Sequence, residues 1–182
     1  MTQRLLLTSF STWLPEQQSN SSDDLLVELT KIDAIAHDLI LLQQLPVEVE
    51  IASSQVIKKI STTQPDSVIC CGMAEKRTRL SVESNASSAA IFSDKLTGDI
   101  GEKVMYTQVD LVSLVGRIQS IDISHDCGKF VCEGLYYSVL DYLRQHQLNI
   151  PCIFVHVPIL TSNNLPQILN DFVLILDRMA LS

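Results

Sequence analysis

The chain has 182 residues, of which 46% are hydrophobic, so it can bury a sizeable core without disulfides or metals. Its 21 acidic and 13 basic residues give a formal net charge of -8, which argues against nucleic acid as the main partner. No stretch reaches the roughly 20 apolar residues that span a bilayer, and the N-terminus lacks a signal-peptide pattern. We therefore expect a cytoplasmic protein with no membrane partner, whose five cysteines stay reduced.

The predicted elements of the first half begin with a strand at residues 4–10. A helix follows at residues 23–38, where leucines and isoleucines recur at helical spacing and Ser21 or Ser22 can cap the start. A second strand is predicted at residues 47–51, then a helix at 53–63 that stops before Pro65, and a short buried strand at 67–71. Residues 72–103 show no clear pattern.

The second half has a clearer pattern. It predicts a helix at residues 111–118, a strand at 121–124, a helix at 131–146, a strand at 152–157 and a closing helix at 165–179. Strands that alternate with helices indicate the α/β class. We expect one domain over residues 1–182, built as a three-layer α/β/α sandwich around a twisted, mostly parallel sheet.

Ligands of open α/β sheets bind beyond the carboxyl ends of the strands. The segments that leave those ends here are residues 10–14, 72–79, 125–130 and 156–158. Reactive side chains in or beside these segments are therefore the first candidates for a functional site.

Three such residues stand out, each with an ordinary alternative. Cys132 begins a predicted helix, whose N-terminus favours a thiolate, but a lone cysteine is usually a buried packing residue. His156 ends an apolar strand and can act as a general base, or it can be a histidine satisfied by backbone groups. Glu83 can orient an imidazole, although an isolated glutamate is usually a solvated surface residue.

Three motifs bring these residues together. The first has the pattern QPD, an apolar strand, G-x-A-x-x-R and E-x-x-A, and consists of Gln64, Pro65, Asp66, Gly72, Ala74, Arg77, Leu80 and Glu83. The second matches S-N-x-A-G-x-[YF]-V-C-N at Ser124, Gly128, Phe130, Val131 and Cys132, and a helix with Tyr136 or Tyr137 follows. The third is FVHVP around His156. Together, over about residues 5–160, they resemble the pyroglutamyl peptidase I family of cysteine peptidases.

The resemblance implies a function and a site. Cys132 would be the nucleophile, His156 the base and Glu83 the residue that orients it. The substrates would be peptides with an N-terminal pyroglutamyl residue, and no metal or organic cofactor would be needed. Phe10 and Trp13 would form the aromatic walls of a pocket with no acidic anchor for an amine, and the loop around Gly72 would offer backbone donors and acceptors. A homo-oligomer is compatible with this assignment.

The chain also departs from the family pattern. The loop usually written T-G-F-x-P-F-G-G here reads TSFSTWL, without its glycine and proline. Glu133 replaces an asparagine after the cysteine, where a carboxylate that faced the sulfur would raise the thiol pKa. Cys127 replaces a small residue, and the segment AAIFSDKLTGD lacks an arginine that the family carries.

Two rival interpretations remain. The departures leave open a catalytically impaired homologue that acts as a binding or interaction protein on the same fold. A metal site could be built from Cys70, Cys71, Cys127, Cys132 and His125, but their spacing is not that of paired zinc ligands, so we expect no metal.

Overall fold

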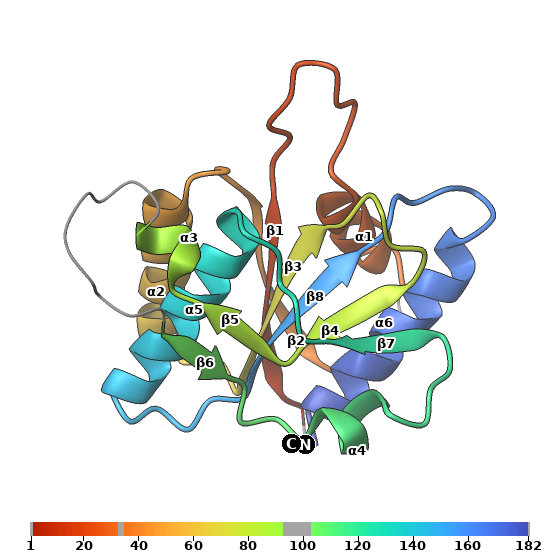
Figure 1. Ribbon diagram of the computed structural model, residues 1–182. Coiled ribbons are helices and arrows are strands. Elements are labelled where there is room, and N and C mark those ends of the chain that lie inside the picture. Colours follow the sequence, from red (N-terminus) through yellow and green to blue (C-terminus); the bar gives the residue numbers. More distant parts are fainter. Residues whose placement is uncertain (1, 33–34, 93–102, 182) are drawn as a thin grey trace.

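The computed structural model describes residues 2–32, 35–92 and 103–181. At the centre of this part of the chain lies a six-stranded sheet with the strand order β2-β1-β3-β8-β4-β7 (Figure 1). Neighbouring strands are parallel except for β4 and β8, which are antiparallel. The sheet is therefore mostly parallel, as predicted. Its strands are β1 (Arg4–Phe10), β2 (Asp38–Leu45), β3 (Ser67–Met73), β4 (Leu80–Glu83), β7 (Ile121–Ser124) and β8 (Cys152–Val157).

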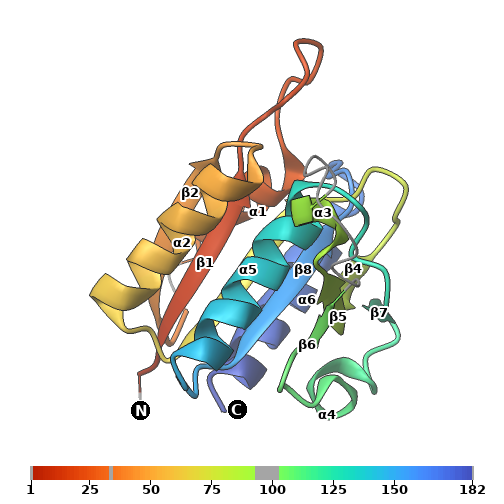
Figure 2. The ribbon, with the colours of Figure 1, turned by 60° about the vertical axis from the view of Figure 1, so that its left-hand side comes forward.

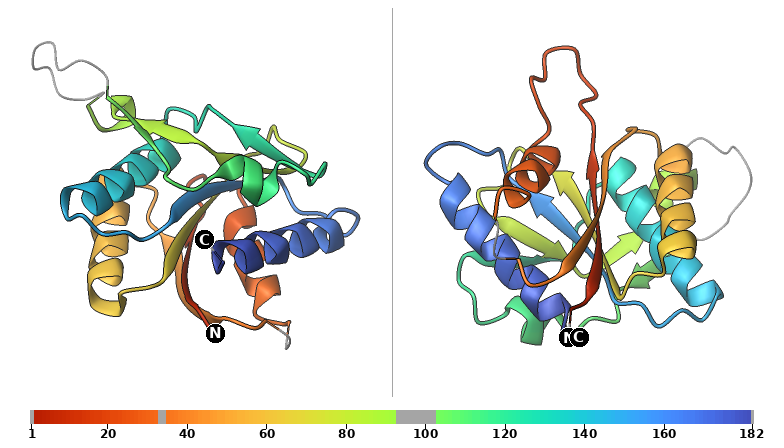
Figure 3. Two further views of the ribbon diagram at one scale, coloured as in Figure 1. Left: turned by 90° about the horizontal axis from the view of Figure 1, so that it is seen from below. Right: turned by 180° about the vertical axis from the view of Figure 1, so that it is seen from behind.

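Helices cover both faces of the sheet, which confirms the α/β class with flanking helices (Figure 3). On one face lie α2 (Val49–Thr63) and α5 (Val131–Gln145), and on the other α1 (Ser21–Leu29) and α6 (Leu165–Met179). The short helices are α3 (Ala89–Phe92) and α4 (Leu111–Val115). A separate two-stranded ribbon of β5 (Asn85–Ser87) and β6 (Val104–Tyr106) lies along α5 (Figure 2). Among the described residues, no helix is both long and apolar enough to cross a membrane.

The strands of the centre are buried on both faces, because successive side chains point in opposite directions. In β1, Leu5 and Leu7 pack with α1 and α6, whereas Leu6 and Phe10 pack with α2 and α5. His156 shares the α5 side with its aromatic neighbour Phe154, whose ring centroid lies 4.9 Å from its own. The face under α5 is therefore the one that can hold a site with His156.

Two predicted elements of the first half were wrong. The first helix ends at Leu29 rather than at residue 38, and the second strand is β2 at residues 38–45 rather than at 47–51. Strand pairing sets the position of β2, because residues 38–42 lie in parallel register with residues 4–8 of β1. Residues 47–51 cannot form this strand, since Val49 already begins α2. Ile32 and Ile35, which extended the apparent helical stripe, pack on the core from outside the helix.

Three further helix ends differ from the predictions, and the first is the start of α2, which lies at Val49 rather than at residue 53. The cap of α1 is the Asn20 side chain, which accepts a hydrogen bond from the backbone N–H of Ser22, rather than Ser21 or Ser22. Helix α4 ends at Val115 instead of residue 118, with Gly116 as its C-cap. Because β4 and β7 run against β8, β7 ends level with Phe154 in the middle of β8, and the segment after it must return toward the carboxyl end of β8 to reach α5 (Figure 1).

Candidate active site

Cys132 is the second residue of α5, and the segment before the helix explains how it is placed there. Gly128 adopts a left-handed backbone with φ of 87°, a conformation that side chains disfavour, and Phe130 is the extended N-cap residue. This bend at Gly128 leads the chain into α5 and places Cys132 in the first turn of the helix. Of the five cysteines, Cys132 is the partly exposed one, while the other four are buried.

His156 and Glu83 form a buried pair on neighbouring antiparallel strands. Oε1 of Glu83 lies 2.7 Å from Nδ1 of His156, and the Glu83 side chain is completely buried. An ionised carboxylate only accepts hydrogen bonds, so Nδ1 of the ring donates. In the neutral imidazole, Nε2 then carries the free lone pair and can accept a proton. Glu83 belongs to β4 itself and is not the solvated residue beyond a strand that its type suggests.

Gly72 is a neighbour of both His156 and the Cys132 thiol. It lies within β3 rather than in a loop, and it is paired in register with His156 of β8. A Cβ atom placed on Gly72 would lie only 2.7 Å from Sγ of Cys132. The thiol therefore packs directly over Gly72, on the side of the sheet that carries His156. Among the described residues, no hydrogen bond joins the thiol to the imidazole.

The Cys132 thiol is less acidic than its position at the start of a helix suggests. Burial, and next the negative charge of Glu83, raise the pKa of Cys132 to about 12, although a backbone hydrogen bond and Arg77 act in the opposite direction. Cys132 thus rests as a neutral thiol near pH 7 and needs a base to become a nucleophile. The Glu133 carboxylate contacts β5, where its Oε1 accepts a hydrogen bond from the backbone N–H of Ser87 at 3.1 Å.

A cavity of about 100 Å³ opens beside Cys132. It lies where the loop after β1, which stands above the sheet in Figure 1, meets the start of α5. Phe10 and Trp13 both line it, but Gly72 does not. The Trp13 and Phe130 rings lie 4.9 Å apart at an angle of 45°, so two half-exposed aromatic side chains form one wall. The remaining lining residues are Asn20, Val47, Met73, Glu75 and Val131.

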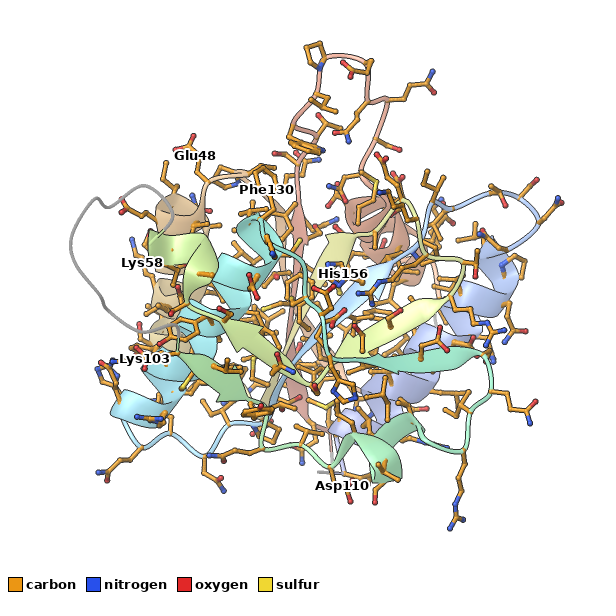
Figure 4. All side chains as sticks on the ribbon, viewed as in Figure 1. Glu48, Lys58, Lys103, Asp110, Phe130 and His156 are labelled. Carbon is orange, nitrogen blue, oxygen red and sulfur yellow. The ribbon has the colours of Figure 1, made fainter. Side chains whose placement is uncertain are left out.

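Several members of this cavity were not predicted from the sequence. Phe130 was recognised only as a motif position, although its place just before a helix at the sheet edge is a usable signal. Figure 4 shows it beside the base of the protruding loop, above His156. Asn20 is buried and held in place, because its Nδ2 donates to the carbonyl of Ser11 at 3.1 Å. Glu75, an exposed residue, also lines the cavity, where we expected no acidic anchor.

The comparison with known families bears on the whole chain. The family model described as pyroglutamyl peptidase matches residues 3–172. The chain belongs to the pyroglutamyl peptidase family. A relative named pyrrolidone-carboxylate peptidase, from Thermoanaerobacter sp. (strain X514), is 29% identical over 173 residues, which cover 86% of this chain and 83% of the relative. Another with the same name, from Brachyspira hyodysenteriae, is 26% identical and covers 93% and 92%.

Solved structures of pyroglutamyl peptidases share the fold. The structure of pyroglutamyl peptidase I from Bacillus amyloliquefaciens superposes with a TM-score of 0.83 at 20% identity, covering 99% of this chain and 98% of that one. The E192I mutant of pyrrolidone carboxyl peptidase from Pyrococcus furiosus gives 0.79 at 17% identity, with 98% of both chains covered. The resemblance inferred from the three motifs is therefore confirmed.

Of two further departures from the pyroglutamyl peptidase pattern, the structure describes only Cys127 in full. Most of the segment without the expected arginine, residues 93–99, lies outside the described residues. Cys127 is buried, and burial followed by the neighbouring Cys132 raises its pKa well above the usual range.

In the part of the chain that the structure describes, no three histidine, cysteine or acidic side chains are grouped so that they could hold a metal ion.

Proposed function

We propose that this protein is a cysteine exopeptidase that hydrolyses the bond after an N-terminal pyroglutamyl residue. Cys132 is the nucleophile, His156 the general base and Glu83 the residue that orients the imidazole. The observation that carries the proposal is the buried contact of 2.7 Å between Glu83 Oε1 and His156 Nδ1, beside a thiol packed over Gly72. Membership of the pyroglutamyl peptidase family supports the same reaction.

The geometry supports the following sequence of steps. His156 Nε2 takes the proton of the Cys132 thiol, and Sγ attacks the carbonyl carbon of the pyroglutamyl residue. The imidazolium, stabilised by Glu83, then protonates the leaving amine, and a thioester remains. A water molecule that gives a proton to His156 hydrolyses the thioester, which releases pyroglutamate and restores the thiol. The thiol and imidazole are expected to come into hydrogen-bonding contact when substrate binds.

The cavity suits the pyroglutamyl ring, which is flat and carries no ammonium group. Phe10, Trp13 and Phe130 supply aromatic surface, and Cys132 lies in the lining of the same cavity. Met73, the neighbour of Gly72, brings the end of β3 to the cavity, so backbone groups of this strand end are candidates to bind the lactam. Trp13→Ala should therefore raise KM more than it lowers kcat.

The test compares pyroglutamyl-, prolyl- and alanyl-arylamides as substrates. The pyroglutamyl compound should be cleaved and the prolyl compound much more poorly, because it lacks the lactam carbonyl and leaves polar groups of the site unpaired. Cys132→Ala should abolish cleavage, with Cys152→Ala as a control that removes a buried thiol from outside the cavity. Equal cleavage of the three compounds would refute the specificity. Folded protein that cleaves none of them would instead support a homologue that only binds.

A further inference from the structure

Arg77 contacts the same carboxylate oxygen of Glu83 that holds His156. Its Nη1 lies 2.7 Å from Glu83 Oε1, the oxygen that also lies 2.7 Å from His156 Nδ1. The N–H bonds of Nη1 do not point at this oxygen, so the contact is an ion pair rather than an aligned hydrogen bond. The Arg77 side chain is only 26% exposed and Glu83 is fully buried. The guanidinium of Arg77 and the imidazole of His156 therefore converge on one atom of Glu83.

A buried carboxylate needs a compensating positive charge, and this site has two groups that can supply it. Arg77 is always cationic, whereas an imidazole gains and loses its charge near neutral pH. Oε2 of Glu83 has no hydrogen-bond partner among the described residues, so compensation occurs at Oε1. If Arg77 were absent, the carboxylate would favour a proton on His156, and an imidazolium cannot accept the proton of Cys132.

Within the described residues, the other groups that interact with the pair do not supply a permanent positive charge. The thiols of Cys132, Cys127 and Cys70 lie on α5, on the segment before it and on β3. From α5, the Tyr136 hydroxyl donates to the backbone carbonyl of Glu83 at 3.2 Å. Glu133 lies on the same helix and contacts Ser87, while His125 contacts Ser84, with its Nδ1 2.7 Å from the hydroxyl.

The same guanidinium also reaches the segment that leads to the nucleophile. Its Nη2 donates to Ser124 Oγ at 3.1 Å and to the carbonyl of Asp126 at 2.8 Å. These residues begin the stretch that returns from β7 to α5 and carries Gly128. Arg77 thus links the orienting carboxylate to the chain that places Cys132.

We propose that Arg77 is a positioning residue that keeps Glu83 ionised and His156 neutral, so that the imidazole is ready to act as a base. The role rests on the proposed function, in which His156 takes the thiol proton. This role differs from one in which Arg77 only holds the segment after β7 in place. A purely structural role of that kind would not change the protonation state of His156.

The test uses the full chain and three variants. Arg77→Met removes the charge, Arg77→Lys keeps it without the forked hydrogen bonds, and Arg79→Met is the matched control. Arg79 is two residues away, half-exposed, and pairs with Asp122 at 3.6 Å rather than with Glu83. The readouts are the NMR titration of the His156 ring and the pH profile of kcat/KM on pyroglutamyl-arylamide.

In Arg77→Met, the midpoint of the His156 titration and the acid limb of kcat/KM should both move up by about one pH unit or more. Activity at pH 7 should fall about tenfold and recover in part at higher pH. Arg77→Lys should titrate close to the parent, and Arg79→Met should match it.

Each result separates one explanation from another. An unchanged His156 midpoint in folded Arg77→Met would overturn the proposal. Equal loss of activity in the methionine and lysine variants, without a shift of the acid limb, would show a bracing role instead. If the parent cleaves no pyroglutamyl-arylamide, the proposed function fails, but the NMR titration still decides the role of Arg77. If Arg77→Met does not fold, Arg77→Lys still tests the proposal. A midpoint of the His156 titration at higher pH in this variant than in the parent would contradict it.

Discussion

Replacement of Gly72 by alanine tests whether the thiol depends on the empty space above β3. The new Cβ would lie 2.7 Å from Cys132 Sγ and 2.8 Å from Cζ of Phe154, about 1 Å closer than relaxed contacts. Phe154 is fully buried and packs between Tyr136 and His156, with ring centroids 5.7 and 4.9 Å away. The ring therefore has little room to move, and the thiol must be displaced.

The expected magnitude follows from the cost of overpacking a filled core, about 1–3 kcal/mol. For a chain of this size each kcal/mol lowers Tm by roughly 2–4 °C, so Tm should fall by roughly 2–12 °C. Because Cys132 is pushed away from the side of the sheet that carries His156, kcat/KM should fall by at least about tenfold in protein that remains folded.

Gly134→Ala is the matched control, since it also crowds α5. Its Cβ would lie 2.7 Å from the Val49 methyl groups of α2 instead of the thiol. Alanine gains up to about 1 kcal/mol over glycine in a helix, which offsets part of the clash. Thermal unfolding, kcat/KM and the iodoacetamide alkylation rate are measured on both variants. A folded Gly72→Ala protein with the parent's kcat/KM and alkylation rate would refute the inferred position of the thiol.

Three further predictions concern the ionisable groups. Glu83→Gln should keep the fold but lower kcat by about a hundredfold or more, because a neutral glutamine cannot stabilise the imidazolium. Turnover like that of the parent would show that Glu83 is misassigned and that only Cys132 and His156 act in catalysis. Limiting iodoacetamide should label Cys132, the partly exposed cysteine, before the four buried ones, and mass mapping that finds another cysteine labelled first would contradict this. Because the packing around its sulfur raises the pKa of Cys132 to about 12, the labelling rate should still increase above pH 9. Burial also raises the pKa of the Cys71 thiol and the Tyr136 hydroxyl well above their usual ranges. Such groups ionise first in the unfolded chain, so Tm should fall between about pH 8.5 and 10.5, and a constant Tm would contradict the assignment.

Local patterns were sufficient to predict much of this protein. Strands β1, β3 and β8 are short, mostly apolar runs, and Pro151 and Pro158 bracket β8. The predicted bounds of these strands and of β7 agree with the structure to within two residues. Helices α5 and α6 show apolar residues at helical spacing and were predicted to within one residue. Motif resemblance identified Cys132, His156 and Glu83 as candidates, although nothing local distinguishes Glu83 from a surface glutamate.

Other features depend on contacts between residues far apart in the sequence. Strand β2 replaces the strand predicted at residues 47–51 because residues 38–42 pair in register with β1. The antiparallel pairing of β4 with β8 brings Glu83 to His156 across 73 residues, and the turn before β4 brings Arg77 to the same oxygen. Burial reverses the thiolate preference expected at the start of a helix. Strand pairing and the loss of water around a group are properties of the packed molecule, which is why these features emerge only from the tertiary structure.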